Sequence, residues 1–177
     1  MTFNIKSLIR TIPNYPMEGI MFRDVTTLFC DAEGMKQCIK QLAELYKDDD
    51  FDLIVGIDAR GFIIGGALAI EMGKGFIPIR KKGKLPADII SEEYALEYGT
   101  ATIEMHKDAL KPNQKILLLD DLLATGGTAM AGVNLIRRLG GIVEHAGFIV
   151  DLPDLGGAKK LASAGVVPRS ICAFEGE

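Results

Sequence analysis

The chain has 177 residues, of which 48% are hydrophobic and 25% are charged, and its formal net charge is −4 at pH 7. At about 150 residues per domain, this length and apolar content predict one folded domain and argue against intrinsic disorder. The acidic balance argues against general binding to nucleic acid or to anionic membranes, because both require excess positive charge. No apolar stretch approaches the roughly 18 residues of a membrane helix. The N-terminus lacks a secretory pattern, and three cysteines without a CxxC pair favour a reducing compartment, so we expect a cytoplasmic protein.

The hydrophobic pattern predicts alternating helices and strands. In chain order, we expect a helix over 33–46 with Asp31 as its cap, a strand over 51–57, a helix over 62–72 and a strand over 76–79. Further along follow strands over 100–105 and 115–119, a helix over 128–139, a strand over 142–150, a helix over 155–163 and an edge strand over 170–174. This alternation predicts a single α/β domain with a central, mostly parallel sheet flanked by helices.

One segment, residues 80–99, shows neither the hydrophobic period of a helix nor that of a strand. It is rich in charge, glycine and proline, and its apolar spacing predicts neither a helix nor a strand. At about twenty residues it exceeds ordinary connections, which favours a functional loop or lid over a simple linker.

The strongest motif follows the apolar strand at 115–119. Two acids, Asp120 and Asp121, precede a loop of small residues, 124–128, that opens the next helix. Backbone N–H groups of such a loop, with threonine hydroxyls and a helix N-terminus, bind a phosphate monoester. The acids would repel that phosphate and instead suit sugar hydroxyls or the water shell of Mg²⁺. Neither the P-loop nor the dinucleotide-binding glycine pattern occurs in the chain.

This stretch resembles the phosphoribosyl-diphosphate motif of the type I phosphoribosyltransferases. The resemblance implies that fold over residues 1–177, with a small N-terminal purine-binding hood (1–32) and a flexible catalytic lid (80–99). It implies that Asp120 and Asp121 bind the ribose hydroxyls. The residues that it assigns to the 5′-phosphate are Ala124, Thr125, Gly126, Gly127 and Thr128.

Further stretches resemble the family members that use adenine, and together they span nearly the whole chain. Residues 16–24 are similar to the purine pocket of those members, where the base lies against an aromatic ring and backbone groups recognise the amino-purine edge. The corresponding residues here are Met21, Phe22 and Arg23. A flat base suits such a pocket, because it needs an apolar wall and few polar groups to set its orientation.

Two more stretches carry the charged part of the resemblance. Residues 56–62 match the diphosphate loop, which implies that Asp58, Ala59 and Arg60 hold the diphosphate and makes Asp58–Ala59 a candidate cis peptide bond. The segment that starts at Ile79 adds the diphosphate-binding cations Arg80, Lys81 and Lys84. Its far end supplies the lid residue Tyr98 and the catalytic residue Glu97, which is expected to share or accept the proton of the base.

The activity implied by the resemblance is transfer of phosphoribosyl from 5-phosphoribosyl 1-diphosphate to adenine in purine salvage, giving AMP and diphosphate. Arg60 acts there as a catalytic cation that stabilises charge growing on the leaving group. Mg²⁺ is expected to be held by substrate and water without a direct protein ligand, and the protein to be a homodimer. Two alternatives stay open, namely a 6-oxopurine phosphoribosyltransferase and a non-catalytic regulator that senses phosphoribosyl diphosphate.

Overall fold

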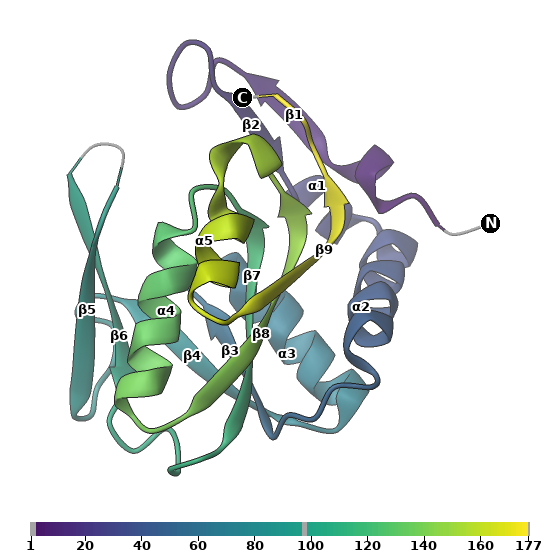
Figure 1. Cartoon of the computed structure of the whole chain (residues 1–177). Coiled ribbons are helices and arrows are strands. Elements are labelled where there is room, and N and C mark those ends of the chain that lie inside the picture. The colour runs from purple at the N-terminus through teal and green to yellow at the C-terminus, as the bar shows by residue number, and fades with distance from the viewer. Residues whose placement is uncertain (1–2, 97–98, 177) are drawn as a thin grey trace.

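The computed structural model describes residues 3–96 and 99–176, and a seven-stranded sheet forms its centre (Figure 1). The strand order is β5-β6-β4-β3-β7-β8-β9. The strands are β3 (Leu53–Ile57), β4 (Gly75–Lys81), β5 (Ile89–Ala95), β6 (Thr100–His106), β7 (Lys115–Leu123), β8 (Ile142–Asp151) and β9 (Val167–Ala173). The pairs formed among β4, β3, β7, β8 and β9 are parallel, whereas β6 pairs antiparallel with both β4 and β5.

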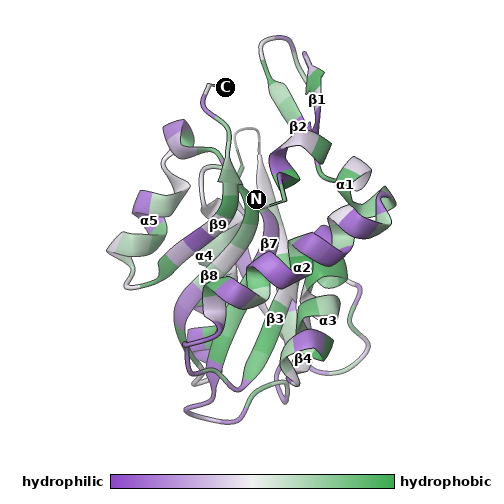
Figure 2. Cartoon of the chain, turned by 90° about the vertical axis from the view of Figure 1, so that its right-hand side faces the viewer, coloured by the Kyte–Doolittle hydropathy of each residue, from purple (hydrophilic) through white to green (hydrophobic). Residues whose placement is uncertain are grey.

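Helices cover both faces of the sheet. Helices α2 (Ala32–Tyr46) and α3 (Arg60–Met72) pack on one face, and α4 (Gly127–Arg138) and α5 (Gly157–Ser163) pack on the other. Strand β7 contributes to both cores, because Leu117 and Leu119 face α2 and α3 while Ile116 and Leu118 face α4. Figure 2 shows the consequence: β3 is coloured largely hydrophobic, whereas α2 alternates between hydrophilic and hydrophobic residues.

A small hairpin precedes this α/β unit. The 3₁₀ turn η1 (Ile5–Leu8) leads into β1 (Arg10–Pro13), which pairs antiparallel with β2 (Met21–Asp24), and α1 (Thr26–Cys30) returns the chain to α2. The hairpin forms a separate two-stranded sheet at the carboxyl edge of the main sheet (Figure 1).

Most of the predicted elements are confirmed. The helices expected over 33–46, 62–72, 128–139 and 155–163 correspond to α2 to α5, and the Asp31 side chain accepts the Gly34 N–H as an N-cap. The mostly parallel sheet flanked by helices is confirmed as well.

Two boundary predictions are wrong. Residues 89–95 are not a loop: they form the edge strand β5, whose backbone pairs with β6. Ser91 and Glu93 are exposed, whereas the Glu92 carboxylate accepts hydrogen bonds from Asn134 and Arg138 of α4. The strand expected over 115–119 extends to Leu123 and carries both acids, because β8 supplies backbone partners beyond the point where β3 ends. In both cases backbone pairing with a neighbouring strand outweighs the side-chain pattern.

None of the helices in the described part of the chain is long and apolar enough to cross a membrane.

Asp24 fixes the turn from the hairpin into α1. Its buried carboxylate accepts hydrogen bonds from the Thr26 N–H at 2.9 Å and the Thr26 hydroxyl at 2.6 Å, and it forms an ion pair with Arg10. These hydrogen bonds from Thr26 and Arg10 lower the pKa of Asp24 from 3.8 to about 2.

We expect Asp24→Asn to lower the free energy of unfolding at pH 7 by about 2 kcal/mol, as for other hydrogen bonds to a charged group. Because folding depresses the pKa of Asp24, its contribution is complete above pH 3.8 and is lost as the pH falls through about 2. Urea unfolding of both proteins at pH 7, 4 and 2.5 measures the difference. A difference that stays constant over that range would contradict the assignment.

Candidate active site

The predicted phosphate loop forms the floor of a cavity at the carboxyl end of β7. The cavity has a volume of about 220 Å³. Its lining residues are Arg60, Asp120, Asp121, Leu122, Leu123, Ala124, Thr125, Gly126, Gly127, Thr128 and Ala129. The seven residues predicted to bind the phosphoribosyl group therefore line one cavity together with the catalytic candidate Arg60.

Glycine packing shapes this loop. Gly126 has φ +82°, a left-handed conformation that L side chains rarely adopt, and α4 begins at the next residue. Behind the loop, Gly157 at the start of α5 donates its N–H to the Ala124 carbonyl at 3.0 Å. A Cβ on Gly157 would lie 2.4 Å from that oxygen, so the close contact requires glycine.

The two acids lie in different surroundings. Asp121 is buried, and its Oδ2 accepts a hydrogen bond from Arg60 Nε at 2.5 Å. Asp120 accepts the Asp121 N–H at 2.9 Å. Burial, and then the negative charge of Asp121, hold the pKa of Asp120 well above its ordinary value. Pairing of one acid and the raised pKa of the other reduce the negative charge beside the phosphate loop.

Arg60 reaches Asp121 because β3 ends before its neighbour β7 does. Strand β3 pairs with β7 only as far as Gly56 with Leu119, and the chain then turns into α3 beside the uncovered end of β7. Gly61 permits this approach, since a Cβ there would lie 2.9 Å from the Leu119 carbonyl oxygen.

The predicted diphosphate loop lies next to β4. The Asp58–Ala59 peptide bond is cis, as the resemblance implied. The Asp58 N–H donates to the Ile79 carbonyl at 2.9 Å, and Asp58 Oδ2 lies 3.3 Å from the Lys81 N–H and 3.5 Å from Arg80 Nε. This carboxylate therefore contacts the first of the predicted diphosphate-binding cations.

The turn after β4 presents those cations. Arg80 Nη1 lies 3.5 Å from the Lys84 carbonyl oxygen. The Gly83 N–H donates to the buried Glu104 carboxylate at 2.9 Å. Glu104 belongs to β6, directly across from Arg80. The alternation of residues in this strand predicts a structural or solvated carboxylate at Glu104 rather than a second base, but it does not reveal that Glu104 holds this turn.

A second, larger cavity adjoins the phosphate loop. It has a volume of about 540 Å³ and is lined by Ile20, Met21, Ala95, Leu96, Thr125, Leu152 and Leu155. Most of these side chains are apolar, as a flat aromatic base requires. Thr125 lines both cavities, so the two spaces meet at the phosphate loop.

The three predicted base-binding residues differ in position. Met21 lines the apolar cavity. Phe22 packs edge-on against Tyr15 with ring centroids 5.2 Å apart, and Arg23 donates to the Thr11 hydroxyl at 2.6 Å. The Phe22 and Arg23 side chains are thus not among the residues lining the cavity.

Five further lining residues were not assigned to the base. Ile20 lies in the predicted purine-pocket stretch 16–24, Ala95 and Leu96 lie in the predicted lid, and only Leu152 and Leu155 fall outside both segments. Leu152 follows the carboxyl end of β8 and Leu155 ends the turn η2 (Pro153–Leu155). The rule that ligands bind at the carboxyl edge of parallel strands would have indicated these two. Two candidates, Glu97 and Tyr98, lie outside the described residues.

Among the described residues, no group of three or more histidine, cysteine, aspartate or glutamate side chains is placed to hold a metal ion.

Comparison with known proteins identifies the family of the chain. A model of the phosphoribosyl transferase domain matches residues 28–154, which include β3, β7 and both predicted anion-binding loops. The chain belongs to the phosphoribosyltransferase family. It is therefore a transferase, and the matched residues include those that line the cavity described above.

Named relatives are similar over nearly the whole chain. The adenine phosphoribosyltransferase of Pseudoalteromonas atlantica is 58% identical over 98% of this chain and 97% of its own length. The crystal structure of adenine phosphoribosyltransferase from Thermoanaerobacter pseudethanolicus is 46% identical, with a TM-score of 0.92 over 96% of this chain and 98% of that one. The enzyme from Saccharomyces cerevisiae, crystallised with adenine and an imino-altritol bisphosphate, is 33% identical, with a TM-score of 0.87 over 94% of this chain and 96% of that one.

We expect Gly157→Ala to raise the KM for phosphoribosyl diphosphate by at least about tenfold, because a misplacement of about 1 Å at an active site costs far more than the added methyl gains. The added Cβ must displace the Ala124 carbonyl and with it the phosphate loop. Steady-state kinetics with Ser163→Ala, an exposed change on the same helix, as the control measures this effect. Unchanged KM in a folded Gly157→Ala protein would contradict the role of this contact.

Proposed function

We propose that this protein transfers the phosphoribosyl group of 5-phosphoribosyl 1-diphosphate to adenine and releases AMP and diphosphate. The observation that carries the proposal is the pair of adjoining cavities: an anion-binding one on the phosphate loop and an apolar one beside it, joined at Thr125. A sugar phosphate in the first and a flat base in the second bring the sugar carbon and the base nitrogen together. The names of the relatives, and the adenine bound to the yeast enzyme, support this choice of base.

In this proposal the loop Ala124–Thr128 binds the 5′-phosphate through backbone N–H groups and threonine hydroxyls. Asp120 and Asp121 bind the ribose hydroxyls. Arg60, which is held at Asp121, faces the same cavity and is therefore placed to meet the substrate as well.

Charge grows on the diphosphate as its bond to the sugar breaks, and the sugar carbon becomes electron-poor. Cations already in place stabilise that charge more in the transition state than in the ground state. We assign this role to Arg60 and to the turn after β4, with Arg80, Lys81 and Lys84, alongside Asp58 and Ala59 of the diphosphate loop. The Asp58 and Glu104 contacts support this assignment, since they fix the turn before substrate arrives.

Adenine occupies the apolar cavity against Met21, with Phe22 and Arg23 contributing through the backbone and the packing of the hairpin. Its ring nitrogen attacks the sugar carbon from the face opposite the departing diphosphate, so configuration inverts. Glu97 accepts or shares the proton that the base loses, and residues 80–99, including Tyr98, close the site against water.

Mg²⁺ fits this site as a partner of the substrate. The described residues offer two neighbouring carboxylates, Asp120 and Asp121, and carboxylate oxygens suit the water shell of a Mg²⁺ ion that the diphosphate carries. When bound, Mg²⁺ neutralises charge on the diphosphate.

We also propose a cytoplasmic homodimer. The exposed face of α3 carries Ile63 and Ile70, whose exposed fractions are 48% and 85%, and apolar side chains on one helix face favour a protein partner. Free thiols at Cys30, Cys38 and Cys172 suit a reducing cytoplasm.

The test is product identification with adenine, hypoxanthine, guanine or xanthine in the presence of phosphoribosyl diphosphate and Mg²⁺. We expect AMP and diphosphate from adenine, and a kcat/KM for the 6-oxopurines lower by at least about 100-fold, because a 6-oxo group reverses the hydrogen bonding of the 6-amino group.

Preferred turnover of hypoxanthine would overturn the assignment of the base. Tight binding of phosphoribosyl diphosphate without transfer to any purine would indicate a sensor instead of an enzyme.

A further inference from the structure

The C-terminal residues 174–176, called here the strap, run from the main sheet to the N-terminal hairpin. The Phe174 N–H donates to the Asp151 carbonyl at 3.0 Å, which extends the pairing of β9 with β8. The Gly176 N–H donates to the Asp154 carboxylate at 2.8 Å. Figure 1 shows the chain end running up from β9 in the direction of the hairpin.

The ring of Phe174 binds two cations from the N-terminal region. Lys6 Nζ lies 4.6 Å and the Arg23 guanidinium carbon 4.4 Å from the ring centroid. Arg23 Nε is buried and has no hydrogen-bond partner. Arg23 as a whole is half-buried, and a guanidinium that is partly shielded from water is attracted to an aromatic face. Phe174 is therefore a main contact of the Arg23 side chain with the body of the protein.

These contacts join the two walls of the apolar cavity. On one wall, Arg23 lies two residues after Met21 on β2, and side chains at that spacing share one face of a strand. On the other wall, Asp154 belongs to η2, between the lining residues Leu152 and Leu155. The strap contacts Arg23 through Phe174 and Asp154 through Gly176, so it spans the distance between the walls.

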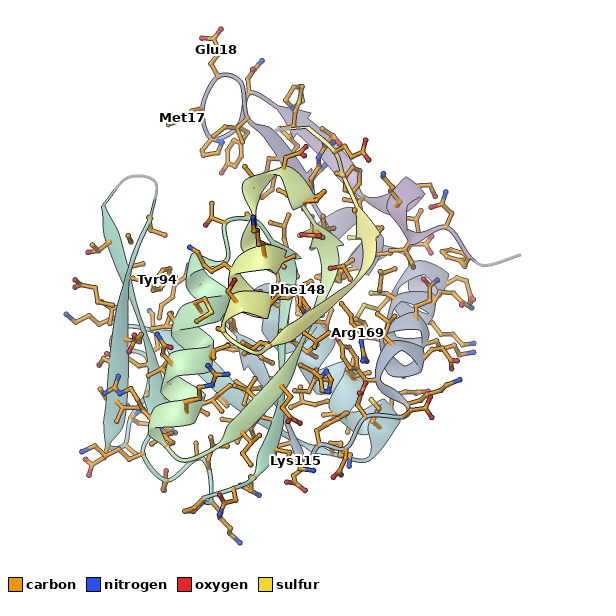
Figure 3. The ribbon with its side chains drawn as sticks, viewed as in Figure 1. Met17, Glu18, Tyr94, Lys115, Phe148 and Arg169 are labelled. Atoms are coloured by element: carbon orange, nitrogen blue, oxygen red, sulfur yellow. The ribbon has the colours of Figure 1, made fainter. Side chains whose placement is uncertain are left out.

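The hairpin is anchored at its base, where Ile9 and Val25 are buried in the core on the α2–α3 face, and the strap adds a contact on β2 itself. The hairpin forms its own two-stranded sheet, and several polar contacts of its side chains stay within the N-terminal region, such as Arg10 with Asp24 and Arg23 with Thr11. Figure 3 shows its tip, with Met17 and Glu18, projecting away from the rest of the molecule.

We infer that Phe174 is a positioning residue for the purine base: by holding Arg23 it sets the position of β2, and so of Met21, over the apolar cavity. The inference rests on the proposed function, because the base must be a substrate for its position to matter. The phosphate loop is held separately, by Gly157 and by the β7–α4 connection. Loss of the Phe174 ring is therefore expected to weaken use of adenine and to spare use of phosphoribosyl diphosphate.

The experiment compares Phe174→Leu, which keeps apolar volume and removes the aromatic face, with Phe174→Tyr, which restores that face. Steady-state kinetics are measured with each substrate varied in turn. We expect Phe174→Leu to raise the KM for adenine roughly threefold to tenfold, the range of a partly desolvated cation–aromatic contact. The KM for phosphoribosyl diphosphate and kcat stay within about twofold, and Phe174→Tyr returns the adenine KM to the wild-type value.

Phe51→Leu is the matched control. Phe51 belongs to the hydrophobic core on the α2–α3 face of the sheet, against which Phe174 also packs, and Lys74 Nζ lies 5.2 Å from its ring centroid. It differs from Phe174 in its place, because it precedes β3 at the opposite edge of the sheet. It is expected to lower the melting temperature without a selective change in the adenine KM.

An unchanged adenine KM in Phe174→Leu, or an equal rise in Phe51→Leu, would overturn the inference. If Phe174→Leu does not fold, Asp154→Ala tests the inference instead, because it removes the carboxylate that holds the strap at Gly176. A raised adenine KM in Asp154→Ala supports the inference, and an unchanged one overturns it. Failure of the proposed function is distinct, since the wild-type protein would then not use adenine at all.

Discussion

The ion pair between Arg60 and Asp121 joins the two loops from which the site is built. It exists because β7 continues past the end of β3, so that α3 begins beside a stretch of β7 that β3 does not cover. Asp121 on that stretch is buried and would be costly without a partner, and Arg60 at the first position of α3 supplies one. The start of α3, directly after Asp58 and Ala59, is thereby held beside the strand end that leads into the loop 124–128.

The proposed site reconciles an acidic chain with a substrate that carries several negative charges. The net charge of −4 is spread over the whole chain, whereas the site as proposed uses backbone N–H groups and the cations Arg60, Arg80, Lys81 and Lys84. The two acids add little negative charge to the site. Asp121 is paired with Arg60, and burial raises the pKa of Asp120, which favours its protonated form. Global charge excludes long polyanions but says little about one small phosphate site.

The central part of the fold could be predicted from the sequence because its signals are local. The apolar strands and the amphipathic helices carry their own periodicity, and the loop 124–128 joins a buried strand to a helix, which places it at the ligand-binding edge of the sheet. The resemblance to known enzymes supplied what periodicity cannot, including the cis bond at Asp58–Ala59.

The rest depends on contacts between segments that are distant in sequence. Strand β5 is stabilised by pairing with β6 rather than by its own alternation. Glu104 holds Gly83 from another strand, and the walls of the apolar cavity come from the hairpin, β5 and η2. The Phe174 ring contacts the Arg23 guanidinium, although most of the chain separates the two residues in sequence. None of these contacts has a spacing that a single sequence reveals, since only the folded sheet brings the partners together.

We expect Arg60 and Asp121 to act as one unit in binding phosphoribosyl diphosphate. Titration calorimetry on the wild type, Arg60→Gln, Asp121→Asn and the double variant tests it as a double-mutant cycle. We expect each single change to raise the Kd by about tenfold or more. The rise in Kd of the double variant is expected to be smaller, by at least about fivefold, than the product of the two single rises. Losses that multiply fully, or tighter binding by Asp121→Asn, would contradict it.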